Sequence, residues 1–197
     1  MLYELAHTIQ SKFPFIWNGI EGVNSALFSA KYRGKLKTIP SILEAFAGEY
    51  TLSEVQEKDV FSLKEFFATQ PEQAFSYFKP HGFDEKSLRR LVRRKSQLML
   101  VAKQDGQIVG YAFLRCFFNN KCFRGKIVDY RHRGKGIAVL LGKATTAISQ
   151  SLGIRMFGTI SKDNISSMAS SEASNTIKIV EELPNDYLYI EYLPKKE

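Results

Sequence analysis

Hydrophobic positions along the chain repeat every three or four residues in some stretches and form short extended runs in others, and this pattern predicts alternating helices and strands from residue 50 onward. The predicted strands are Tyr50–Val55, Leu98–Lys103, Gln107–Phe118, Lys121–Tyr130, Ile154–Ile160, Ile177–Leu183 and Tyr187–Leu193. The predicted helices follow Asp59, Pro71, Asp84 and Gly136, and the last one spans Asn164–Ser174. This order predicts an α/β protein, with a central mixed sheet that carries helices on both faces.

The first 48 residues have a different pattern and predict an N-terminal helical extension, so we divide the chain into an extension (1–48) and a main domain (49–197). The extension is expected to hold three helices, which are Leu2–Lys12, Ile16–Tyr32 and Ser41–Ala47. Its aromatic residues indicate that it packs against something. The sequence leaves open whether it forms a homodimer contact, covers a pocket or completes the core.

Composition places the chain among soluble globular proteins, because 44% of its 197 residues are hydrophobic and 24% are charged. No apolar run approaches the roughly 20 residues of a membrane helix, and Glu4 stands where a signal peptide would carry positive charge. We therefore expect a cytoplasmic protein without a membrane span. Two cysteines and three histidines, with no ligand-like spacing, predict neither a disulfide framework nor a metal site.

A formal charge of +8 would suit nucleic acid, an anionic membrane surface or a small molecule with several phosphates. The charge alone does not choose among these partners. No nucleic-acid-binding motif is present, so nucleic acid is the least favoured partner.

The most informative segment is residues 127–138, in which a strand leads through a basic glycine loop directly into an amphipathic helix. The start of a helix offers free N–H donors, and glycines at positions 134 and 136 let the backbone approach an anion. Together with Arg131, Arg133 and Lys135, this loop predicts a pyrophosphate site. Neither the P-loop pattern GxxxxGK[ST] nor the dinucleotide pattern GxGxxG is present.

The segment, with its pattern Arg131-x-x-Gly134-x-Gly136 after a strand, resembles motif A of the GNAT superfamily of acyl-CoA-dependent N-acetyltransferases. The resemblance covers about residues 50–193 and implies that the central strand splays away from its neighbour to receive acetyl-CoA. It implies that the pantetheine arm faces Ile127, Val128 and Asp129 and that the pyrophosphate lies on the loop. The implied cofactor-binding residues are completed by Arg131, Arg133, Gly134, Lys135, Gly136, Ile137, Ala138, Asn164 and Ser167.

Two positions depart from the family pattern. Tyr130 stands where a proline is common, and Ser171 stands where many relatives carry a tyrosine that protonates the leaving thiolate. Ser171 is a poor acid, so the catalytic assignment is weaker than the fold assignment.

The implied reaction is an acyltransferase reaction, in which a primary amine attacks the acetyl-CoA thioester directly and passes through a tetrahedral intermediate. The candidate catalytic residues are His81, Asp129 and Ser171. His81 has a suitable pKa range for a base, but a turn histidine bound to the backbone is an equally simple interpretation. Asp129 lies beside the expected thioester, but it could instead pair with Arg131.

The resemblance favours a small-molecule amine as the acceptor, with an amino sugar or a nucleotide-activated amino sugar as one form of it. A protein amine acceptor and a non-catalytic acetyl-CoA sensor are the alternatives. No metal is expected in any of these.

Overall fold

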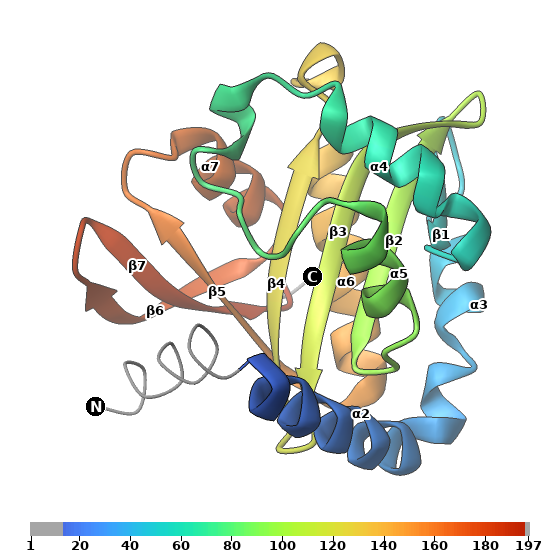
Figure 1. Cartoon of the computed structure of the whole chain (residues 1–197). Coiled ribbons are helices and arrows are strands. Elements are labelled where there is room, and N and C mark those ends of the chain that lie inside the picture. The colour runs from blue at the N-terminus through green and yellow to red at the C-terminus, as the bar shows by residue number, and fades with distance from the viewer. Residues whose placement is uncertain (1–13, 196–197) are drawn as a thin grey trace.

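The computed structural model describes residues 14–195, and within them one seven-stranded mixed sheet forms the centre of the protein (Figure 1). The expected helix Leu2–Lys12 lies outside the described residues. The strands are β1 (Thr51–Glu54), β2 (Gln97–Gln104), β3 (Gln107–Phe117), β4 (Lys121–Val128), β5 (Arg155–Ser161), β6 (Thr176–Leu183) and β7 (Tyr187–Leu193). The predicted α/β class is confirmed.

The strands follow the order β1-β2-β3-β4-β5-β7-β6, and every neighbouring pair is antiparallel except β4 and β5. Two tight hairpins join β2 to β3 and β3 to β4. Asp105, Gly106 and Asn120 adopt positive φ angles in these turns, as the sequence predicts.

The parallel pair β4 and β5 is joined only near its beginning, where residues 121–123 pair with residues 155–157. Beyond Phe123 the two strands diverge, and Figure 1 shows the gap widening toward the end of β4. The splayed sheet implied by the resemblance is therefore present.

Helices cover both faces of the sheet (Figure 1). On one face lie α4 (Val60–Ala68) and α5 (Glu85–Val92), whose apolar side chains share a core with Val101, Tyr111 and Phe113. On the other face α6 (Ile137–Leu152) buries Leu141, Ile148 and other apolar residues, and α7 (Ile165–Ser174) packs beside it. Gly153 ends α6 in a left-handed conformation, as predicted.

The extension contributes α2 (Pro14–Leu36) and α3 (Ile39–Glu44), and both helices join the core beneath α6. Phe28, Tyr32, Ile39 and Leu43 are buried there. Asn24 fixes α2 to the end of β3, because its amide donates to the Cys116 carbonyl at 2.9 Å and accepts from the Phe118 N–H at 3.1 Å. In the described residues the extension thus completes the core of the main domain.

Two local expectations were wrong. The segment after Pro71, expected to form a helix from Glu72 to Phe78, makes only a 3₁₀ turn at Glu72–Phe75. Asp59 precedes α4 but does not cap it, since its carboxylate accepts from Lys103 Nζ at 2.8 Å and from the Gln56 N–H at 2.9 Å.

None of the helices in the described part of the chain is long and apolar enough to cross a bilayer.

Candidate acetyl-CoA site

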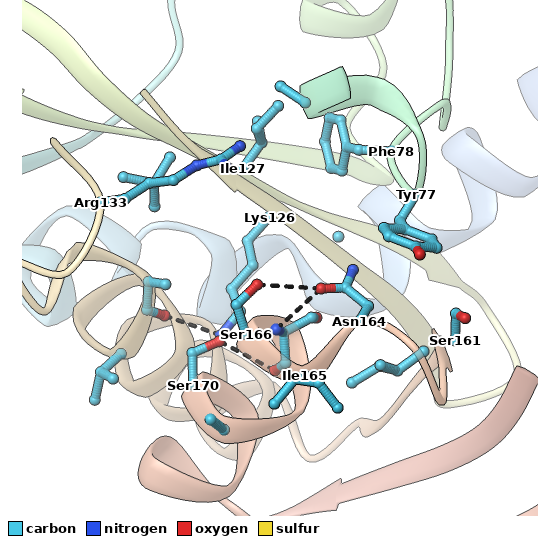
Figure 2. Close-up of a pocket in the computed structure, with 18 of the residues that line it drawn as sticks. Tyr77, Phe78, Lys126, Ile127, Arg133, Ser161, Asn164, Ile165, Ser166 and Ser170 are labelled. Carbon is cyan, nitrogen blue, oxygen red and sulfur yellow. Dashed lines mark hydrogen bonds between the residues drawn. The ribbon is translucent and has the colours of Figure 1, made fainter. Parts of the chain in front are cut away.

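A cavity of about 820 Å³ opens where β4 and β5 separate. Its walls come from the second half of β4, the glycine loop, the first turn of α6, the end of β5 and α7, and a short segment before α5 closes one side (Figure 2). The predicted cofactor-binding residues that line it are Ile127, Val128, Arg133, Gly134, Gly136, Ile137, Ala138, Asn164 and Ser167. Residues distant in the sequence therefore meet around one cavity.

The glycine loop has the geometry that its two glycines predict. Gly134 and Gly136 have φ angles of +76° and +79°, which residues with a side chain rarely adopt. A Cβ at either position would meet no atom within 4 Å, so open space adjoins the loop backbone. Gly136 precedes α6 and no side chain caps the helix, which leaves the positive end of its dipole to the cavity.

Asp129 is 2% exposed and lies at the end of β4, outside the cavity lining. Its carboxylate accepts from the Arg131 guanidinium at 2.8 and 3.0 Å and from the Arg131 N–H at 2.8 Å. The Arg131 hydrogen bonds hold the pKa of Asp129 well below its usual range. The structure therefore shows the Asp129–Arg131 pair that the sequence left as an alternative. Neither Arg131 nor Lys135 lines the cavity.

His81 lies in an aromatic cluster with Phe67, Phe83 and Tyr111 on the face of the sheet covered by α4 and α5, and it does not line the cavity. Its Nδ1 is 2.9 Å from the Gly82 carbonyl oxygen and its Nε2 is 2.9 Å from Tyr111 Oη. Since a carbonyl can only accept, Nδ1 carries the proton and neutral Nε2 accepts from the Tyr111 hydroxyl. Burial lowers the pKa of His81.

Helix α7 presents some of its serines to the cavity and buries another. Asn164 caps the helix by accepting from the Ser167 N–H at 3.1 Å, and Ser166 donates to the same amide oxygen at 3.2 Å (Figure 2). Ser167 and Ser170 line the cavity. Ser171, by contrast, is 0% exposed, points into the core and does not line the cavity.

Several residues that line the cavity were not identified from the sequence. Tyr77 and Phe78 line it from the segment after Pro71, and Figure 2 shows the Tyr77 ring facing the region of Asn164. Arg124 and Lys126 line it from β4. In the sequence, Arg124 and Lys126 alternate with Gly125 and Ile127, which places the two basic residues on one face of the strand. That pattern was the available signal, but a strand covered by helices on both faces is expected to carry apolar residues there.

Solved structures with the same fold have low sequence identity to this chain. The PaiA N-acetyltransferase from Thermoplasma acidophilum, solved with coenzyme A, matches with a TM-score of 0.63 and 14% identity over 74% of this chain and 99% of that one. An N-acetyltransferase from Staphylococcus aureus Mu50 matches with a TM-score of 0.59 and 19% identity, over 75% of this chain and 99% of that one. AAC(6')-Ib, solved with paromomycin and acetyl-CoA, matches with a TM-score of 0.57 and 12% identity, over 75% of this chain and 94% of that one.

No relative of the chain was found among curated protein sequences. The family model for the acetyltransferase (GNAT) domain, however, matches residues 63–165, slightly more than half of the chain. This match extends from α4 through the splayed β4 and the glycine loop to the start of α7, and it includes most of the cavity walls apart from those of α7 and β7. The chain therefore belongs to the GNAT family and is an N-acetyltransferase.

Proposed function

We propose that this protein transfers an acetyl group from acetyl-CoA to the primary amine of a small molecule. The observation that carries the proposal is the cavity between the splayed strands, which ends at an uncapped helix start behind two left-handed glycines. Such a site suits a pyrophosphate joined to a long, narrow arm.

The residues present fit acetyl-CoA. Open space over Gly134 and Gly136 leaves room for phosphate oxygens against the backbone, and Arg133 adds a cation on the same side of the cavity. The exposed edge of β4 at Ile127 and Val128, which no longer pairs with β5, offers backbone groups to an amide-bearing arm. When bound, acetyl-CoA would supply the acetyl group as a reactive thioester.

The acceptor amine has to be neutral before it can attack. Asp129 is a weak base, since Arg131 holds it ionised, and His81 points Nε2 at Tyr111 rather than into the cavity. These residues and Ser171 stay predictions as catalytic groups. In their place, the ordered walls of the cavity would contribute mainly by holding the amine and the thioester together.

An amino sugar or a nucleotide-activated amino sugar is the acceptor form that we favour. Tyr77 and Phe78 support it, because they line the cavity and aromatic rings pack well against the apolar face of a sugar. A cytoplasmic location would give the enzyme access to such acceptors.

Calorimetric titration with acetyl-CoA tests the donor, and a thiol-release screen over amines, amino sugars and nucleotide amino sugars tests the acceptor. We expect micromolar binding, a loss of at least tenfold in Arg133→Ala, and little change in the control Lys143→Ala, whose lysine is exposed on α6. Absence of acetyl-CoA binding would refute the proposal. Binding without release on any small amine would refute the acceptor class and favour a protein amine.

A further inference from the structure

Two cationic side chains lie inside the candidate acetyl-CoA cavity on the same face of β4. Arg124 is 7% exposed and Lys126 is half-buried, and both line the cavity. Figure 2 shows the Lys126 side chain running from β4 toward α6, beneath Asn164 and Ser166.

The hydrogen-bond partners of both cations are uncharged. Arg124 Nη1 donates to Asn175 Oδ1 at 2.9 Å and to the Gly142 carbonyl at 3.4 Å, and its guanidinium carbon lies 3.5 Å from the centre of the Tyr192 ring. Arg124 Nη2 is buried and has no hydrogen-bond partner. Lys126 Nζ donates to the Ala138 carbonyl at 3.0 Å.

No carboxylate of the described residues forms an ion pair with either side chain. Among the charged residues nearby, Asp163 and Arg133 line the same cavity, and Asp163 is exposed and forms no ion pair with Arg124 or Lys126. Glu172 of α7 and Lys143 of α6 are exposed, and Glu191 of β7 pairs with Arg155 at 2.7 Å. A buried cation without a counter-ion is costly, so proteins rarely retain one unless an anion joins it. The cavity is open to such an anion.

The position of Arg124 separates it from the glycine loop. Its contact with Gly142 lies six residues after Gly136, which corresponds to roughly 9 Å along a helix. Arg124 therefore lies deeper in the cavity than the loop, toward the point where β4 and β5 join. Lys126 lies between the two, because its Nζ reaches the Ala138 carbonyl in the first turn of α6.

We infer that Arg124 and Lys126 form a subsite for a carboxylate group carried by a substrate of this enzyme. The inference rests on the proposed function and specifies its substrate class. The carboxylate could belong to the acyl group of a dicarboxylic acyl-CoA or to an amino acid acceptor, and the two sources share this chemistry. A monoanion is the matching ligand, because only Arg124 carries a permanent charge here.

The donor arm of the test compares succinyl-CoA with acetyl-CoA by calorimetry, so that the coenzyme portion is constant. In the acceptor arm, amino acids are titrated into the complex of the protein and acetyl-CoA. Each amino acid is compared with the amine that remains when its carboxylate is removed. We expect a preference of about tenfold for the carboxylate in one arm, falling to near unity in Arg124→Met and in Lys126→Met but not in Lys143→Met.

Protonation of Lys126 provides a second readout, which is measured in the unmodified protein and so does not depend on whether a variant folds. Burial, together with the charge of Arg124, lowers the pKa of Lys126 to about 7, so the amine is mostly neutral at pH 8. A bound carboxylate raises that pKa, and calorimetry at pH 8 in buffers of different ionisation enthalpy should show proton uptake with the preferred ligand. The Lys126→Met variant should lose this uptake.

The absence of a carboxylate preference in both arms would overturn the inference while leaving acetyl-CoA binding, and hence the proposed function, intact. Equal loss of acetyl-CoA and succinyl-CoA affinity in Arg124→Met would also overturn it, because the side chain would then serve the coenzyme. Failure of acetyl-CoA to bind the unmodified protein would instead refute the proposed function itself.

Discussion

The Arg131 guanidinium closes on the Asp129 carboxylate with two hydrogen bonds, from Nε at 3.0 Å and from Nη2 at 2.8 Å. Gln70 adds a contact of 3.4 Å to the same carboxylate and accepts from the Tyr130 N–H at 3.0 Å. These bonds fix the end of β4 to the start of the glycine loop. We therefore expect Asp129 to orient the loop, and its role as a base stays a prediction.

Replacing Asp129 by Asn should destabilise the protein by about 1–2 kcal/mol, a modest value because the Arg131 side chain is 56% exposed. Because Asp129 has a lowered pKa, its contribution is present at neutral pH and should be lost as the pH falls below about 4. Thermal unfolding of both proteins between pH 3 and pH 7 measures this. If Asp129 were the general base, Asn would in addition remove a limb of the pH profile of kcat/KM.

Replacing His81 by Phe should destabilise the protein by about 1–3 kcal/mol, because the buried Tyr111 hydroxyl would lose its partner. The second change Tyr111→Phe removes that hydroxyl and should restore part of the stability, so the two effects should not add. Denaturant unfolding of the two single variants and the double variant measures the coupling.

The pH dependence of His81 has a defined sign. Its pKa is lowered in the folded protein, so the neutral form is favoured and stability should decline as the pH falls below about 6.5. The His81→Phe variant should lack this decline. A catalytic role would show differently, as a loss of kcat/KM for the acceptor that Tyr111→Phe does not restore.

Replacing Asn164 by Ala should cost about 1 kcal/mol, because the Ser167 N–H loses its cap, whereas Asp should keep most of that stability. Acetyl-CoA titration then separates two roles. If Asn164 only caps α7, the Asp variant should bind acetyl-CoA as the original protein does. If its amide also contacts the coenzyme, both variants should bind more weakly.

Replacing Tyr77 by Phe should lower kcat about 10- to 100-fold with little change in acetyl-CoA affinity. The reason is that the Tyr77 phenol lines the cavity and could protonate the leaving thiolate. The hydroxyl groups that α7 brings to the cavity are all serines, which are poorer acids, and Ser171 is buried. Steady-state kinetics and calorimetry of the variant measure both quantities. The matched variant Tyr187→Phe removes another hydroxyl from the lining, and equal losses in the two would argue against a specific role for Tyr77.

The sequence alone was sufficient for the order of the elements and for the glycine loop. Strand and helix periodicities are local properties, and Asp105-Gly106, Gly153 and Asn164 mark turns and caps through their own backbone preferences. The loop was equally readable, because its anion site consists of consecutive residues, 133–138, at the start of one helix.

Only the tertiary structure decided which side chains reach the cavity. Ser171 and Ser170 are neighbours in the sequence, yet the helical rotation of about 100° per residue buries one and exposes the other to the cavity. Arg124 and Lys126 appear in the sequence as charges within a strand, and only the packing of β4 against α6 and α7 shows that no carboxylate meets them in the described residues. Such pairings depend on contacts between segments far apart in the chain, which no local pattern encodes.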